Sequence, residues 1–185
     1  MNLQKMFEMQ KELDDRIIKE KGLEGQDLLP NLILALQVEL AECANEWRGF
    51  KHWSNDRDPR TCVIDKKGQT AKEYYKNPLL EEYVDCLHFI LSIGNKFGLN
   101  SKKTISSIHL SYLSSTIGFN TERLFSSLMS TAYRLQVMNG KEAQFLDLCV
   151  SFFILGERLG FKWEQIEAAY MDKNAVNHQR QQEGY

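Results

Sequence analysis

Residues 30–48 read PNLILALQVELAECANEWR, and this stretch decides the fold class. Its apolar residues recur every three or four positions, which is the spacing of one face of an α-helix. Those residues are Leu32, Leu36, Leu40, Cys43 and Trp47. Pro30 suits the first turn of a helix, because its missing N–H would have no partner there. Gly49 marks the end. The stretch therefore predicts a helix with one buried stripe.

The same periodicity recurs on both sides of this helix and predicts further helices. They span residues 3–21, 78–97, 121–138, 141–159 and from 163 past 170. The Ser-rich segment 101–117 fits either a weak helix or a hairpin-like connector. Residues 50–77 are polar and irregular, which predicts a long loop of the kind that is often functional. No segment shows convincing strand alternation. We expect a single all-α catalytic domain over residues 1–185, built as a helix bundle.

Composition limits the classes of partner. The 185 residues carry 23 Lys and Arg against 25 Asp and Glu, a net charge of −2, which argues against a surface for a nucleic-acid polymer. A site for one nucleotide needs only a few local charges. The charged N-terminus does not resemble a signal peptide, and no apolar run approaches the ~18 residues that span a membrane. The widely spaced Cys43, Cys62, Cys86 and Cys149 fit free thiols better than disulfides or a zinc site. We expect a cytoplasmic protein.

Carboxylates gather beside the apolar stripes of two predicted helices. Glu39, Glu42 and Glu46 follow one another at helical spacing, and Glu82 and Asp85 repeat the pattern on helix 78–97. Residues three and four apart share a helix face, so each set forms an acidic column. No Lys or Arg lies three or four residues from Glu39 or Glu42. Like charges at this spacing repel, so the columns destabilise the helices unless a cation neutralises them.

All-oxygen ligands suit Mg²⁺, with Mn²⁺ as a substitute. We expect Glu39, Glu42, Glu82 and Asp85 to bind such an ion across two adjacent helices. The alternative is a set of ordinary solvated acids at the edge of a bundle. A di-iron carboxylate protein is a further alternative, because Asp85 and His88 have the spacing of a Glu-x-x-His element. That element is needed twice, and helix 30–48 has no histidine, so His88 fits a lining residue better.

Five sequence elements together resemble the dimeric dUTPases of the all-α NTP pyrophosphatase superfamily. They are Met9-Gln10 with Leu13-Asp14-Asp15, Glu39-Leu-Ala-Glu42 with Glu46, Phe50-Lys51-His52-Trp53, Glu82-Tyr-Val-Asp85-Cys-Leu-His88-Phe89-Ile-Leu-Ser92, and Lys173-Asn174 with Asn177, Arg180-Gln181 and Gly184-Tyr185. The resemblance covers both ends and the middle of the chain. Residues 101–140 match no part of it.

The resemblance implies that dUTP is hydrolysed to dUMP and pyrophosphate by a homodimer. Glu39, or else Glu42, would act as the general base beside the bound Mg²⁺. The tail at about residues 170–185 would bind phosphate, with Lys173 and Arg180 supplying positive charge and Lys51 as a further candidate. Candidates for the wall around the base are Trp53, His88 and Phe89. Candidates for polar contacts with the base are Gln10, Asn174 and Asn177.

One departure from the family pattern leaves the substrate open. Asp14 stands where the family is expected to carry an amide side chain. A related nucleotide pyrophosphatase acting on dCTP, or on a broad range of nucleotides, would keep the same acids and differ only at the base. A non-catalytic helical module is a further alternative, although it would not need the acids.

Overall fold

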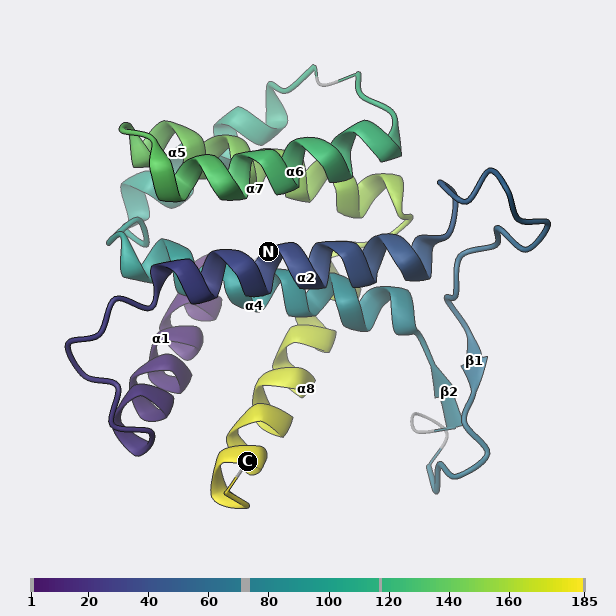
Figure 1. The fold of residues 1–185 in the computed structure, drawn as a ribbon, viewed down its shortest axis with the longest axis horizontal. Coiled ribbons are helices and arrows are strands. Elements are labelled where there is room, and N and C mark those ends of the chain that lie inside the picture. The colour runs from purple at the N-terminus through teal and green to yellow at the C-terminus, as the bar shows by residue number, and fades with distance from the viewer. Residues whose placement is uncertain (1, 71–73, 117, 185) are drawn as a thin grey trace.

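The computed structural model describes residues 2–70, 74–116 and 118–184, and it confirms the all-α fold class (Figure 1). Within these ranges the helices are α1 Leu3–Glu20, α2 Leu29–Trp47, α4 Pro78–Lys96, α5 Lys102–Leu113, α6 Thr121–Val137, α7 Lys141–Arg158 and α8 Trp163–Gln182. Two strands, β1 Val63–Ile64 and β2 Tyr75–Lys76, pair antiparallel. Tyr185, at the end of the predicted phosphate-binding tail, lies outside the described residues, as do 71–73 of the predicted loop and 117.

The helices form layers around a central pair. In Figure 1, α2 and α4 lie side by side, α5, α6 and α7 lie on one side of them, and α1 and α8 lie on the other. Helix α4 contacts α1, α2, α7 and α8, and α1 also contacts α8. Helices α1, α2, α4 and α8 therefore pack as a four-helix group. This group contains every residue of the predicted acid columns and residues 170–182 of the predicted tail.

Helix α4 is buried along most of its length, which fixes where its polar residues point. Gly94 lies where an added Cβ would come within 2.6 Å of Phe145 and 2.7 Å of Phe7, so glycine allows the close approach of α4 to α7 and α1. At the other end of α4, the Tyr83 hydroxyl donates to the Phe152 carbonyl at 2.9 Å, and the two rings stack at 4.2 Å. These contacts hold α4 firmly between the layers.

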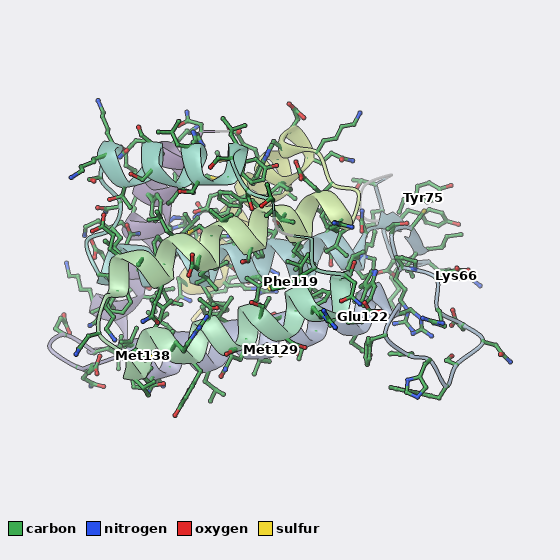
Figure 2. The ribbon with its side chains drawn as sticks, turned by 90° about the horizontal axis from the view of Figure 1, so that it is seen from above. Lys66, Tyr75, Phe119, Glu122, Met129 and Met138 are labelled. Carbon is green, nitrogen blue, oxygen red and sulfur yellow. The ribbon has the colours of Figure 1, made fainter. Side chains whose placement is uncertain are left out.

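The structure decides one segment that the sequence left open and contains one pair of strands that the sequence did not predict. The segment 101–117 contains helix α5, capped by the Ser101 side chain, which accepts from the Thr104 N–H at 3.2 Å. The predicted loop carries the β1–β2 hairpin, which the sequence did not predict. Figure 2 shows this region, labelled at Lys66 and Tyr75, extending away from α6 with its Met129 and Met138.

All four cysteines are free thiols, as predicted. In the described ranges, no helix combines the length and the apolar character needed to cross a membrane.

Candidate active site

An acid cluster lies where α2 and α4 pack together. Glu39 and Glu42 on α2 and Glu82 on α4 place one carboxylate oxygen each within 4.8 Å of one another. The three-residue spacing on α2 aligns its two glutamates on the face toward α4, as the sequence predicted. Glu39 and Glu82 are half-buried and Glu42 is exposed. Oxygens this close together can bind one shared cation.

Asp85 follows Glu82 by one helical turn and connects the cluster to α8. Its Oδ2 accepts from Lys173 Nζ at 2.5 Å. Burial raises the pKa of Asp85, while Lys173 and then Arg180 act in the opposite direction. The two basic residues of the predicted tail thus bring positive charge to the acids of α4.

The carboxylates of the cluster disfavour one another's ionised form. Burial, followed by the charges of Asp85, Glu42 and Glu39, raises the pKa of Glu82 to about 7. Burial, followed by Asp85 and Glu42, also raises the pKa of Glu39. Lys173 opposes both shifts but does not cancel them. The cluster therefore carries more negative charge than the chain compensates, and an added cation would relieve this repulsion.

A cavity of about 630 Å³ lies beside the cluster, between α1, α4, α8 and the start of α2. One wall is apolar and includes Leu13, Ile17, Ile18, Leu28 and Leu32. The polar lining includes Gln10, Asp14, His88, Ser92, Asn177 and Arg180. His88 follows Asp85 by three residues and Asn177 follows Lys173 by four, so cluster and cavity are neighbours along the same two helices. The volume falls within the range of small-molecule sites.

A hydrogen-bond network fixes the polar end of the cavity. The Gln10 Oε1 accepts from the Tyr170 hydroxyl at 3.1 Å and lies 2.6 Å from His88 Nδ1. Burial lowers the pKa of His88 to about 3, so its imidazole is neutral. Because Gln10 Oε1 only accepts, Nδ1 carries the proton and Nε2 is an acceptor. Among the residues that the structure describes, neither this buried Nε2 nor the buried Nδ2 of Asn174 has a hydrogen-bond partner.

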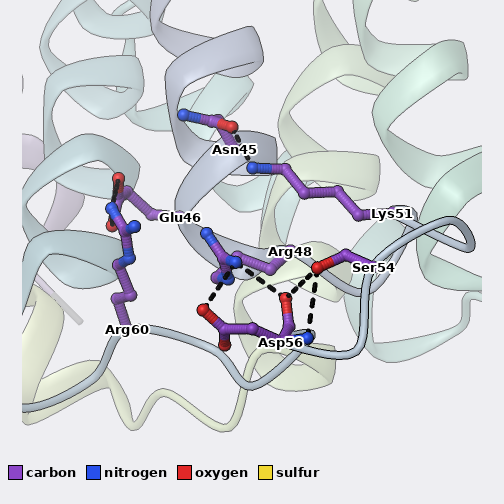
Figure 3. Close-up of polar contacts among 7 residues, drawn as sticks. All are labelled: Asn45, Glu46, Arg48, Lys51, Ser54, Asp56 and Arg60. Carbon is purple, nitrogen blue, oxygen red and sulfur yellow. Dashed lines mark hydrogen bonds and ion pairs between the residues drawn. The ribbon is translucent and has the colours of Figure 1, made fainter.

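Two ion pairs that involve arginines hold the first part of the loop against the end of α2 (Figure 3). Arg48, the left-handed cap of α2, donates through Nη2 to both the carbonyl and the carboxylate of Asp56, at 2.7 and 2.8 Å. Arg60 Nη1 donates to Glu46 Oε1 at 3.1 Å. Glu46 is therefore neutralised by an arginine and lies outside the three-carboxylate group.

Lys51 and Trp53 lie in this anchored segment and do not line the cavity. Lys51 Nζ donates to Asn45 Oδ1 at 2.5 Å, which holds it against the last turn of α2 (Figure 3). Trp53 is 67% exposed and packs edge-on against His52 at 4.9 Å. The structure thus does not bring these two predicted substrate-binding residues to the other candidates.

The comparison with protein families identifies the chain. The family model described as dUTPase matches residues 2–185. The chain belongs to the dUTPase family. Family membership implies a hydrolase that acts on nucleotide diphosphate bonds, and the all-α fold agrees with the resemblance seen in the sequence. The comparison with curated proteins found no match.

In this dUTPase-family chain, most of the predicted site residues fall into two adjoining groups. The acids and their cation are Glu39, Glu42, Glu82, Asp85 and Lys173. The predicted residues that line the cavity are Gln10, His88, Phe89, Asn177 and Arg180. Sequence reasoning included Ser92 only as the last residue of a family motif, with no role assigned, and it gave no site role to Tyr170. Their partners Asp14 and Gln10 lie on α1, far away in the sequence, so no local pattern reveals them.

Proposed function

We propose that this chain hydrolyses dUTP to dUMP and pyrophosphate, with Mg²⁺ bound by Glu39, Glu42, Glu82 and Asp85. The observation that carries the proposal is the position of the acid cluster beside a nucleoside-sized cavity, in a chain of the dUTPase family. A triphosphate bound with its base in the cavity would extend its phosphates along α4 and α8 toward the acids.

The donor set fits Mg²⁺, with Mn²⁺ as a substitute. The three close ligand atoms are all carboxylate oxygens, which hard divalent cations prefer. Burial and then the charges of neighbouring carboxylates raise the pKa of Glu39 and of Glu82, and a bound cation would offset the repulsion between the carboxylates. A di-iron centre has less support, because His88 hydrogen-bonds to Gln10 and does not belong to the three-carboxylate group.

When bound, Mg²⁺ would neutralise phosphate oxygens and lower the pKa of a water molecule. Glu39 then accepts the proton of the attacking water. Glu39 suits this role because it is half-buried, which raises its pKa, and a base works best with a pKa nearer neutrality; Glu42 is exposed. Lys173 and Arg180 bind phosphate oxygens, and Lys173 exchanges part of its contact with Asp85 for the substrate.

The cavity residues hold the nucleoside. His88 and Phe89 form the wall beside the base, and Gln10, Asn174 and Asn177 provide polar contacts. Lys51 and Trp53 remain proposed substrate contacts, and the loop would have to move to bring them to the nucleotide. The family resemblance also supports a homodimer, and the four free thiols support a cytoplasmic location.

Pyrophosphate release from a panel of deoxynucleoside triphosphates, with and without Mg²⁺, tests the proposal. We expect dUTP to give equal amounts of dUMP and pyrophosphate, only when Mg²⁺ or Mn²⁺ is present. Absence of pyrophosphate from dUTP with Mg²⁺ would overturn the activity. Iron analysis of the purified protein separates the di-iron alternative, for which stoichiometric iron is expected.

A further inference from the structure

Asp14 lines the cavity, and both hydrogen bonds that the structure describes to its carboxylate reach the same oxygen, Oδ1. Its Oδ1 accepts from Gln10 Nε2 at 2.9 Å and from the Ser92 hydroxyl at 3.0 Å. In the part of the chain that the structure describes, no hydrogen bond to Oδ2 is present. Asp14 lines the cavity, so Oδ2 is the atom that a bound base can contact.

The hydrogen-bond network around Asp14 determines which of its carboxylate oxygens accepts hydrogen bonds from the protein. Gln10 Oε1 is already bonded to Tyr170 and His88, so the Gln10 amide nitrogen must face Asp14. Turning this amide around would require His88 to change tautomer and the Tyr170 hydroxyl to accept instead of donate. The observed arrangement therefore favours an acceptor at the position of Oδ1.

The open oxygen also accepts at the pH of an enzyme assay. Burial raises the pKa of Asp14 to about 6, so at pH 8 the carboxylate is ionised and offers acceptors only. Cytosine carries an exocyclic amino group, a donor, at the place where uracil carries a carbonyl oxygen. A carboxylate attracts the amino group and repels the carbonyl. It can still accept from the ring N–H of uracil.

We propose that Asp14 makes this cavity accept cytosine as well as uracil, so that the enzyme hydrolyses dCTP in addition to dUTP. Asp14 is then a specificity-determining residue, whose Oδ2 accepts a hydrogen bond from the exocyclic amino group. This inference rests on the proposed function, since it concerns the base of the same substrate.

The variant Asp14→Asn reverses the polarity of the contact. In the observed arrangement of Gln10, the new amide oxygen takes the position of Oδ1 and accepts from Gln10 Nε2, and the amide NH₂ faces the cavity. This donor suits the uracil carbonyl and opposes the cytosine amino group. We expect kcat/KM for dCTP, relative to dUTP, to fall about 10- to 100-fold, the effect of one charged hydrogen bond. Glu12→Gln, an exposed change on the same helix, should leave the ratio unchanged.

Absence of dCTP turnover in a wild type that hydrolyses dUTP would overturn the inference. Equal loss of both activities in Asp14→Asn would do the same, because a merely structural role lowers both. If neither nucleotide is hydrolysed, the proposed function itself fails. Equilibrium binding of dCMP and dUMP without Mg²⁺ then tests Asp14 separately. An unchanged ratio of the two dissociation constants in Asp14→Asn would contradict its role, and a thermal melt confirms that the variant is folded.

Discussion

Lys173 on α8 and Asp85 on α4 form an ion pair, with 2.5 Å between Nζ and Oδ2. Their side chains are 26% and 18% exposed, so the pair is largely shielded from water. Such a pair interacts more strongly than one on the surface, where screening reduces the contribution to about 0–1 kcal/mol. The same contact places the lysine of the tail beside the carboxylates that we propose bind the metal. We therefore expect substrate binding and the docking of α8 to be coupled through Asp85.

Replacing Lys173 by methionine should destabilise the protein and reduce turnover. The change leaves Asp85 without its cation among repelling acids, so we expect the free energy of unfolding to fall by about 1–2 kcal/mol in chelator. Loss of a phosphate contact should lower kcat/KM at least tenfold, roughly the effect of one charged hydrogen bond. Urea melts and pyrophosphate release measure the two effects. Lys173→Arg keeps the charge and should retain most of the stability. A methionine variant as stable as wild type would contradict the coupling.

Glu39→Gln and Asp85→Asn should abolish turnover while the fold is retained. Each change removes an anionic ligand, and the first also removes the proposed base, which typically contributes 10²–10⁴-fold. We expect dUTP hydrolysis to fall at least about 100-fold, with an unchanged circular dichroism spectrum. Glu46→Gln is the matched control on α2, because Glu46 pairs with Arg60 and should retain turnover. Near wild-type activity in Glu39→Gln or Asp85→Asn would exclude the metal assignment.

Helical periodicity predicted most of the fold, because a buried stripe at a spacing of three to four residues is visible in one helix alone. The structure has helices in all the predicted segments. Helix α5 stayed ambiguous because its segment is Ser-rich and buries only Thr104, Ile105 and Ile108. The β1–β2 hairpin was missed, since two-residue strands are too short to show alternation.

The residues of the site also fall into two kinds, those that local helix spacing predicted and those that meet only because distant helices pack together. Glu39 and Glu42 meet because helix geometry alone aligns them, so their spacing predicted the cluster. The bond from Ser92 to Asp14 joins residues 78 positions apart, and the bond from Tyr170 to Gln10 joins residues 160 apart. These pairs depend on how α1, α4 and α8 pack, which no local pattern specifies. The loop positions of Lys51 and Trp53 depend on the arginine contacts at the end of α2.

Glu82→Gln should stabilise the metal-free protein at neutral and alkaline pH. The pKa of Glu82 is raised from its ordinary value of 4.5 to about 7, so the folded protein favours the protonated carboxyl. The stability that this preference contributes is fully present below the ordinary pKa and is lost as the pH rises through about 7. In chelator, the Tm of the wild type should therefore fall between pH 6 and pH 8, and less so in Glu82→Gln. Mg²⁺ should raise the Tm of the wild type more at pH 8 than at pH 6. A variant that melts lower than the wild type in chelator at pH 8 would refute the repulsion argument.

Asp14 should affect the pH dependence of stability in the same direction, in a lower pH window. Its pKa is raised from 3.8 to about 6, so ionisation is harder in the folded protein and stability is lost as the pH rises through about 6. Asp14→Asn removes this loss, and we expect about 1–2 kcal/mol of added stability at pH 8, discounted from the full shift. Asp15→Asn is the control, because Asp15 is exposed and pairs with Lys11 on the surface. Urea melts at pH 5 and pH 8 measure the difference. Parallel pH profiles for Asp14→Asn and wild type would show that burial does not raise the pKa of Asp14.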